Sequence, residues 1–499
     1  MPVFFPFDNT YARELPGFYQ ACQPERARAP QLLFLNRGLA DELRLVLGGQ
    51  DDDALAALFS GNELPTGAQP IAQAYAGHQF GQFNPQLGDG RALLIGEVID
   101  VHGQRRDIAL KGSGRTPFSR RGDGKAVVGP MLREVLIGEA MHALGIPATR
   151  ALAVVATGEA VFREKALPGA ILTRVAASHL RVGTFQYFAA HGTVEQVRRL
   201  ADYAIARHYP ELIGAENRCL EFLRAVSERQ AALIAQWMHV GFIHGVMNTD
   251  NMAISGETID FGPCAFMESY NPGAVFSSID EMGRYAYSEQ PVIAQWNLAR
   301  LAETLLPLIH EDEAQAIDLA TAVIDAFSDR YRHDWITHAR TKLGLNNHAT
   351  EHLQTDIVLA SNWLDLLHAQ QVDFTLAWRY LADAAEGKEA RLRSLFAGQP
   401  GLDGWLTHWR ERCMAEDANR PDAGRERALR MRRVNPWLIP RNHRVEEALA
   451  AASDEGDLTP FEALLNALRK PFDEDPARAR YAEPAPGEFM AEFRTFCGT

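Results

Sequence analysis

The hydrophobic pattern of the chain changes near residue 190, and this change restricts the folds that the chain can adopt. Before it lie short apolar runs of strand length, at residues 92–100, 107–111, 151–156, 159–162 and 170–175. Beyond it, residues 194–208 and 216–239 carry apolar side chains at three- and four-residue spacing, which is typical of amphipathic helices. A strand-rich half followed by a helix-rich half predicts an α+β fold with two lobes.

Local signals refine this prediction. The turn residues His102-Gly103-Gln104 predict a hairpin between the first two strands. Pro130 predicts the start of a helix running to about Leu144, because proline is favoured at the first helical position. The remaining predictions are short strands at residues 252–254 and 257–259, and short amphipathic pieces at residues 31–47 and 53–60.

The length of 499 residues suggests two to four structural units, at roughly 150 residues per unit. We expect an N-terminal extension at residues 1–70 and a strand-rich N-lobe at residues 71–185. A helical C-lobe at residues 186–330 and a helical C-terminal extension at residues 331–499 complete the prediction.

Charge and composition exclude several classes of protein. The net charge of −14 argues against general nucleic-acid binding, which requires a basic surface. No apolar run is long enough to cross a membrane, and the N-terminus lacks the pattern of a signal peptide. The five cysteines form no C-x-x-C pair, so neither a zinc ribbon nor a disulfide framework is indicated. We therefore expect a cytoplasmic protein.

The most informative motif is His244-Gly245-Val246-Met247-Asn248-Thr249-Asp250-Asn251, followed nine residues later by Asp260-Phe261-Gly262. Protein-kinase catalytic loops read H-R-D-x-x-x-x-N and are followed by D-F-G. His244 and Asn251 keep the seven-residue offset, and Asp260 supplies the carboxylate that holds the metal in such sites. The motif predicts a phosphate-transfer site of the protein-kinase-like type.

Lys111 ends the second predicted strand, as the phosphate-binding lysine of kinases does. Glu134, on the following helix, could pair with it, and Glu139 is a less favoured alternative. Taken alone, such a pair could equally be a surface ion pair of little energetic value.

Val246 stands where a kinase keeps its catalytic aspartate, and a valine cannot accept a proton. Asp250 is the nearest carboxylate of the loop that could do so. An ordinary protein kinase is therefore doubtful. A kinase that moves the γ-phosphate, and a non-catalytic nucleotide-binding scaffold, remain the alternatives.

Glycines and cations surround the predicted strands. Gly88-Asp89-Gly90-Arg91 precedes the first strand, and glycines let backbone N–H groups approach phosphate oxygens. Residues 111–125 place five cations among four glycines, and Arg174 and Arg181 follow. Such a set could grip an extended triphosphate. A plain turn and a solvated basic loop are the simpler readings.

Taken together, these segments resemble the selenoprotein O family, whose members are protein-kinase-like and were once regarded as pseudokinases. The resemblance covers most of the chain. It rests on the segments A-Y-A-G-H-Q-F-G-Q-F, L-G-D-G-R, L-K-G-S-G-R-T-P-F-S-R-R-G-D-G, H-G-V-M-N-T-D-N and I-D-F-G-P.

The resemblance implies a bacterial protein adenylyltransferase. Such an enzyme transfers AMP from ATP to Ser, Thr or Tyr hydroxyls of protein substrates and releases pyrophosphate. The nucleotide is flipped relative to a kinase, so that its α-phosphate faces the acceptor. Some bacterial members use UTP for uridylylation.

The resemblance also implies residue roles. Asp250 would be the proton acceptor, and Asn251 and Asp260 would hold Mg²⁺ or Mn²⁺, Asp260 also lying against the nucleotide through that metal. The residues implied in nucleotide binding are Gly88, Gly90, Arg91, Lys111, Asp123, Gly124, Arg174 and Arg181, with Glu134 orienting Lys111.

Cys497 stands where some members of that family carry selenocysteine, third from the C-terminus. This position suggests redox control of the active site, with Cys264 as a conceivable disulfide partner.

His348-Ala349-Thr350-Glu351-His352 fits H-x-x-E-H, an inverted zinc-protease signature. Two histidines four residues apart on one helical face could hold a metal ion. No convincing third ligand lies nearby in the sequence, so the match is expected to be fortuitous.

Overall fold

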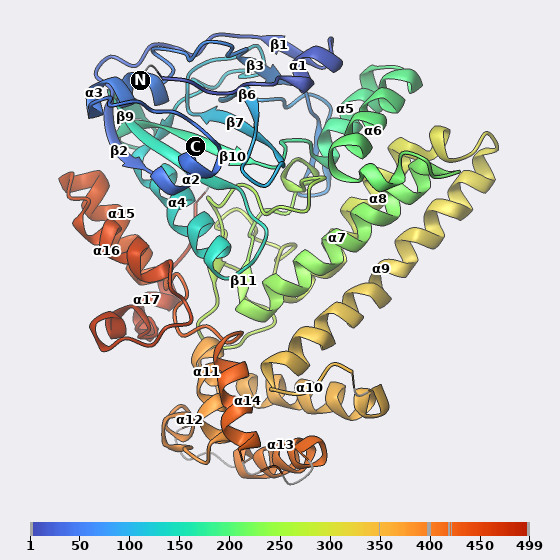
Figure 1. The fold of residues 1–499 in the computed structure, drawn as a ribbon, viewed down its shortest axis with the longest axis vertical. Coiled ribbons are helices and arrows are strands. Elements are labelled where there is room, and N and C mark those ends of the chain that lie inside the picture. The colour runs from blue at the N-terminus through green and yellow to red at the C-terminus, as the bar shows by residue number, and fades with distance from the viewer. Residues whose placement is uncertain (1–2, 349, 397–400, 418–419, 421, 497–499) are drawn as a thin grey trace.

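The computed structural model describes residues 3–348, 350–396, 401–417, 420 and 422–496. It combines an antiparallel sheet in the N-terminal part with a helical C-terminal part, so the predicted order of strands and helices is confirmed (Figure 1).

The main sheet has eight strands in the order β1-β3-β6-β7-β10-β9-β2, with β8 paired to β10. Its strands are β1 (Tyr19–Ala21), β2 (Gln31–Leu35), β3 (Ile71–Gln73), β6 (Ala92–Ile99), β7 (Arg105–Lys111), β8 (Ala126–Val127), β9 (Arg150–Phe162) and β10 (Ala166–Ala176). Two small two-stranded sheets pair β4 (Gly77–Gln79) with β5 (Gln82–Asn84) and β11 (Phe242–Ile243) with β12 (Ala265–Phe266).

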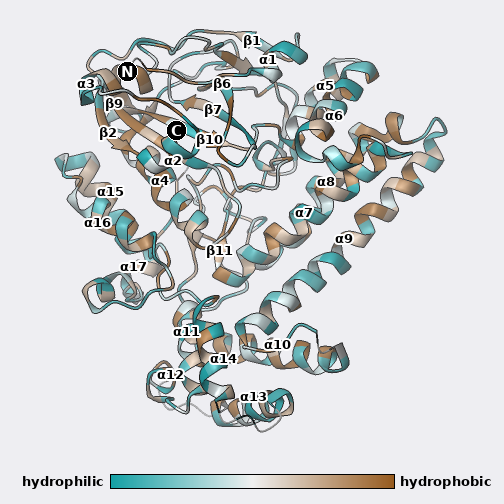
Figure 2. Ribbon diagram, in the orientation of Figure 1, coloured by the Kyte–Doolittle hydropathy of each residue, from teal (hydrophilic) through white to brown (hydrophobic). Residues whose placement is uncertain are grey.

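Both faces of the sheet are covered. On one face, Leu55 and Phe59 of α3 pack with Val98 and Val155 of the sheet. On the other face, α4 packs against β9 and β10 and joins the largest apolar core, which continues into the helical part. Figure 2 shows apolar residues along the strands, whereas the long helices alternate between apolar and polar residues. The N-terminal helices are α1 (Thr10–Glu14), α2 (Arg37–Glu42), α3 (Asp52–Phe59) and α4 (Val128–Ala143).

The helical part begins with α5 and centres on α7, which packs along α8 and α9. The side chain of Asn217 caps α7 by accepting a hydrogen bond from the backbone N–H of Leu220. These helices are α5 (Val182–His191), α6 (Val194–His208), α7 (Arg218–Val240), α8 (Gln290–Ile309) and α9 (Glu313–Lys342).

The C-terminal helices form a cluster below α9, and the chain then returns to the sheet (Figure 1). Helices α15 and α16 pack against α4. The elements are α10 (Leu353–Ala369), α11 (Phe374–Ala385), α12 (Ala390–Ser394), α13 (Leu402–Asp417), α14 (Ala423–Arg432), α15 (Asn442–Ala450), α16 (Thr459–Leu468) and α17 (Gly487–Glu492). Among the described residues, no helix has the length and apolar character needed to span a bilayer.

Several local predictions are confirmed and others are wrong. The hairpin around residues 102–104 forms, and the helix predicted from Pro130 begins at Val128. The runs at 151–156 and 159–162 are one strand, β9, because they pair continuously with β2 and β10 across the predicted break. The pieces at 252–254 and 257–259 are not strands, because each makes only a single bridge, Arg181 to Ala253 and Ala148 to Thr258.

The first 70 residues contribute directly to the sheet. β1 and β2 supply its two outer strands, so this segment extends the sheet as well as covering it. Residues 31–47 contain a strand and a short helix, β2 and α2, whereas residues 53–60 coincide closely with the helix α3.

Candidate active site

A cavity of about 750 Å³ lies where the sheet meets the helical part. Its walls come from the β4–β5 hairpin, the turn before β6, the loop after β7, the start of α4 and the two segments around residues 246–251 and 260–263. All twelve site residues expected from the sequence line it: Gly88, Gly90, Arg91, Lys111, Asp123, Gly124, Glu134, Arg174, Arg181, Asp250, Asn251 and Asp260. The tertiary structure therefore gathers residues that are up to 172 positions apart, since 260 − 88 = 172.

Lys111 lies at the end of β7, where its ammonium group is buried between two carboxylates. Its Nζ lies 2.6 Å from Glu134 Oε1 of α4 and 2.5 Å from Asp260 Oδ1. Glu139, the alternative partner, instead pairs with Arg150 at 2.9 Å and Arg469 at 3.2 Å. The helix therefore presents Glu134 toward the cavity and Glu139 away from it.

Two buried arginines add positive charge beside Asp260. Arg174 of β10 places Nη1 2.9 Å from Asp260 Oδ1. Arg181, which precedes α5, donates from Nη1 to the backbone oxygen of Asp250 at 3.1 Å and stacks over the Tyr75 ring at 4.4 Å. Although burial alone would raise the pKa of Asp260, the charges of Lys111, Arg174 and Arg181 hold it well below its usual range.

The loop that carries Asp250 is held by its flanking polar groups. His244 Nε2 lies 2.9 Å from the backbone oxygen of Ile259, so the histidine ties this loop to the segment before Asp260. Asn251 donates from Nδ2 to the backbone oxygen of Val246 at 3.0 Å, which leaves its amide oxygen as the atom for another partner. Val246 itself is buried and lines the cavity.

Asp250 is a buried carboxylate with little hydrogen bonding. Its Oδ2 accepts one long hydrogen bond, from Gln79 Nε2 at 3.4 Å, and its Oδ1 has no hydrogen-bond partner among the described residues. Burial raises the pKa of Asp250 to about 6. A Cβ at position 77 would lie 2.4 Å from Asp250 Oδ1, so glycine at that position makes room for the carboxylate. Such a carboxylate is suited to accept a proton.

The turn at residues 88–90 differs from the expectation that its N–H groups face phosphates. The backbone N–H of Gly88 donates to the backbone oxygen of Tyr75, and that of Gly90 donates to the backbone oxygen of Gly88. The backbone N–H of Asp89 donates to the backbone oxygen of Gln73. The role of Gly88 is steric, because a Cβ there would lie 2.3 Å from the Phe118 ring and its φ is +71°. These glycines bring the loop after β7 close to the cavity.

Cations of that loop line the rim of the cavity. Arg115, Arg120 and Arg121 are exposed, and no ion pair of theirs occurs within the described part of the chain. Lys125 instead pairs with Glu159 at 2.5 Å. Asp123 pairs with Arg163 at 2.8 Å, and this arginine holds the pKa of Asp123 below its usual value.

Sequence reasoning missed Arg163, Gln79 and Tyr75 as wall residues. Arg163 follows β9 and reaches the cavity only because β9 and β10 form a long hairpin. Gln79 ends β4 and lies within the segment A-Y-A-G-H-Q-F-G-Q-F, which carried part of the family resemblance without revealing the contact of Gln79 with Asp250.

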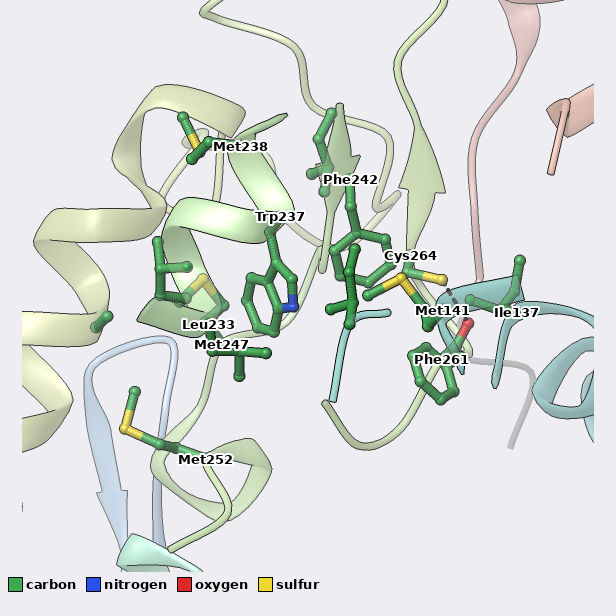
Figure 3. Packing of buried hydrophobic residues seen from close by; sticks show 14 of the residues in the cluster. Ile137, Met141, Leu233, Trp237, Met238, Phe242, Met247, Met252, Phe261 and Cys264 are labelled. Atoms are coloured by element: carbon green, nitrogen blue, oxygen red, sulfur yellow. Dashed lines mark hydrogen bonds between the residues drawn. The ribbon is translucent and has the colours of Figure 1, made fainter. Parts of the chain in front are cut away.

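Phe261 anchors the segment that carries Asp260. Its ring is fully buried in the apolar core, together with Ile137 and Met141 of α4 (Figure 3). The Cys264 thiol donates to the backbone oxygen of Phe261 at 3.1 Å, and burial raises the pKa of this thiol to about 12. Cys497, the conceivable disulfide partner of Cys264, lies outside the described residues.

The H-x-x-E-H match does not form a helical metal site. His348 lies in a turn before the short helix Thr350–His352, so the two histidines do not share a helical face. Within the described ranges, no group of three or more His, Cys, Asp or Glu residues could hold a metal ion.

Comparisons with known proteins agree with this geometry. Residues 4–469 match the family described as "Protein adenylyltransferase SelO". A protein of Chromobacterium violaceum named "Protein nucleotidyltransferase YdiU" is 61% identical over 486 residues, covering 97% of this chain and all of the relative. Proteins of the same name from a Cereibacter sphaeroides strain and from Agrobacterium fabrum are 59% and 56% identical, each covering 99% of this chain and 100% and 99% of the relative.

The match spans both the sheet and the helical part, so it covers every residue that lines the cavity. The chain therefore belongs to the SelO family of protein adenylyltransferases.

Proposed function

We propose that this protein transfers a nucleotide, AMP from ATP or UMP from UTP, to Ser, Thr or Tyr hydroxyls of other proteins. The observation that carries the proposal is the buried Asp250 carboxylate. One of its oxygens has no partner within the described residues, and the carboxylate lines the same cavity as Lys111, Arg174 and Arg181. A proton acceptor beside three phosphate-binding cations suits attack of a hydroxyl on a phosphorus atom.

The nucleotide would be held mainly by side chains. Lys111, Arg174 and Arg181 would neutralise phosphate charge in the buried part of the cavity, and Arg91 would add charge nearer the opening. Glu134 would keep Lys111 directed toward the phosphates. Gly88, Gly90 and Gly124 would shape the wall around the nucleotide, and the pair of Asp123 with Arg163 would hold the loop in place.

The donor set at the base of the cavity fits Mg²⁺ or Mn²⁺. The amide oxygen of Asn251 and the carboxylate of Asp260 are hard oxygen donors, and both line the cavity. Two protein oxygens completed by phosphate oxygens and water are a usual arrangement for Mg²⁺ in nucleotide sites. A bound divalent ion would neutralise the developing phosphate charge.

The chemical step would use Asp250 as the base. As the acceptor oxygen bonds to the α-phosphorus, its proton passes to the Asp250 carboxylate. The bond from the α-phosphorus to the bridging oxygen breaks, and pyrophosphate leaves with the bonding electrons. This assignment accounts for Val246, since a base supplied four residues later makes an aspartate at that position unnecessary.

We further propose that the architecture is the bilobal protein-kinase-like fold, with an N-lobe at residues 71–185 and a C-lobe at residues 186–330. The pair of Lys111 with Glu134, and the contact of His244 with the segment before Asp260-Phe261-Gly262, support this assignment. Residues 1–70 and 331–499 would be extensions of that core.

The proposal is tested by transfer of label to protein from ATP labelled at the α- or the γ-phosphate, with α-labelled UTP in parallel. Asp260→Ala serves as the inactive control. Transfer from the α position alone, lost in the variant, is the expected result. Transfer from the γ position alone would identify a kinase, and transfer from neither would identify a nucleotide-binding scaffold.

A further inference from the structure

Arg174 has a second buried contact, on the side of its guanidinium away from the cavity. Its Nη1 faces Asp260, whereas its Nε lies 3.2 Å from His179 Nε2. The other ring nitrogen of His179, Nδ1, lies 3.0 Å from Asp107 Oδ2 of β7, and the backbone N–H of His179 donates to the same oxygen at 2.9 Å. All three side chains are buried.

These contacts define the protonation of His179. Arginine carries only donors, so His179 Nε2 must accept from Arg174 and its proton must lie on Nδ1, from which it donates to Asp107. Burial lowers the pKa of His179 to about 4, which is consistent with a neutral ring at neutral pH. The histidine therefore acts as a fixed hydrogen-bond acceptor behind Arg174.

Asp107 is itself held on both oxygens. Its Oδ1 accepts from Arg207 Nη2 of α6 at 2.5 Å, while Oδ2 faces His179. Arg207 also lies 3.4 Å from Glu97 Oε2, and Glu97 accepts from the backbone N–H of Tyr11 at 2.6 Å. A continuous buried network thus runs from α1 through the sheet to the cavity.

We propose that His179 and Asp107 are positioning residues that hold the guanidinium of Arg174 in the orientation needed for phosphate binding. A guanidinium fixed at both Nε and Nη1 cannot rotate about its side chain without losing a buried hydrogen bond. The proposal rests on the proposed function of Arg174 in nucleotide binding. His179 and Asp107 are not among the residues that line the cavity.

The central experiment is a double-mutant cycle measured as kcat/KM for nucleotide transfer. We expect His179→Leu, which removes the acceptor, to lower kcat/KM about 10- to 100-fold. In an Arg174→Ala background the same substitution should change kcat/KM less than about twofold, because its only route to the reaction is gone. His179→Gln, whose amide oxygen can accept from Arg174, should recover most of the activity.

The experiment also includes a test through Asp107. In Asp107→Asn the amide nitrogen must face either Arg207 or His179, and both present a donor there. We expect this variant to lose kcat/KM in the same Arg174-dependent way. It replaces His179→Leu if that protein fails to fold.

His208→Phe is the matched control. His208 is a partly buried histidine of this region, but its hydrogen bond is to Ser178 Oγ at 2.7 Å. Its substitution should affect the thermal midpoint without changing kcat/KM for the nucleotide. An equal loss for His179→Leu in both backgrounds, or full activity of His179→Leu, would overturn the proposal.

Nucleotide binding separates this proposal from the proposed function. If the wild-type protein bound ATP but transferred no label, the proposed function would fail. The double-mutant cycle would then be measured with the Kd for ATP in place of kcat/KM. His179→Leu should weaken ATP binding in the wild-type background and not in the Arg174→Ala background. An equal effect in both backgrounds would refute the positioning role.

Discussion

Lys111 and Lys342 are equally buried, each with 5% of its surface exposed, but they lie in different regions and have different partners. Lys111, in the sheet, is flanked by the carboxylates of Glu134 and Asp260. Lys342, at the end of α9, lies over the rings of Phe374 and Trp378 and donates to the backbone oxygen of His239. No carboxylate pairs with Lys342 within the described residues, and burial lowers its pKa to about 7.

For two buried aspartates the pattern is reversed: the one at the cavity lacks a partner and the one far from it is paired. Asp356, on α10, is surrounded by Arg412 at 2.6 Å and Arg340 at 2.8 Å. Asp250, at the cavity, has an oxygen that none of the described residues contacts by a hydrogen bond. A buried polar group without a partner costs free energy, so its retention at the cavity points to a partner that arrives with the substrate.

The comparison shows that burial alone does not identify a functional charge. Away from the cavity, the buried Asp356 is matched by arginines of the protein, and the buried Lys342 can lose its proton. At the cavity, the charges are arranged around space that a ligand can enter. Four substitutions test this difference.

The largest effect is expected for Asp250→Asn, which cannot accept a proton. We expect kcat for nucleotide transfer to fall about 100- to 10,000-fold, with nucleotide binding retained. Transfer from α-labelled ATP, together with the Kd for ATP, measures both quantities. Asp356→Asn is the control, and a similar loss of kcat in that variant would remove the distinction between the two aspartates.

Lys111→Met should lower kcat/KM about 100- to 1,000-fold, because it removes a cation directed at the phosphates. Lys342→Met should leave kcat/KM unchanged, since its contacts are with His239 of α7 and with Phe374 and Trp378 of α11, none of which lines the cavity. The same transfer assay compares the two variants. Equal losses would contradict the assignment of Lys111 to the site.

Asp356→Asn should lower the free energy of unfolding by about 3–5 kcal/mol, because it leaves two buried arginines without their shared carboxylate. Urea denaturation measures this change. Asp250→Asn should lower the free energy of unfolding far less or raise it, since that carboxylate has few partners to lose. A larger destabilisation by Asp250→Asn would indicate a structural role for that residue.

Lys342→Met should raise the free energy of unfolding by about 1–4 kcal/mol below pH 7, because a buried charge is replaced by an apolar chain. The pKa of Lys342 falls from 10.5 to about 7 on folding. Between these values the unfolded chain binds more protons than the folded one, so the wild-type protein gains stability as pH rises. The difference in free energy of unfolding between Lys342→Met and the wild-type protein should therefore shrink toward pH 10. Urea midpoints of both proteins at pH 6.5 and 9.5 measure this difference. A difference independent of pH would contradict the lowered pKa of Lys342.

Much of the site could be predicted from the sequence because its signals are local. The spacing from His244 to Asn251 and the following Asp260-Phe261-Gly262 are short-range patterns, and they indicated Asp250, Asn251 and Asp260, which line the cavity. The resemblance to a known family supplied the roles of the other expected site residues. The hairpin before Lys111 and the helices at residues 194–208 and 216–239 followed from periodicity and turn chemistry. The same local signals failed at residues 151–162, where pairing with two neighbouring strands joined two predicted strands into one.

The sequence by itself determined which chemical groups are available: the motif residues, the strand-to-helix order and the absence of an aspartate at Val246. Only the tertiary structure decided how they are used. It paired Lys111 with Glu134 and not Glu139, committed the N–H groups of residues 88–90 to the protein, and placed His179 behind Arg174. The reason is physical: hydrogen bonding and burial depend on contacts between distant segments, whereas sequence patterns report the geometry of near neighbours.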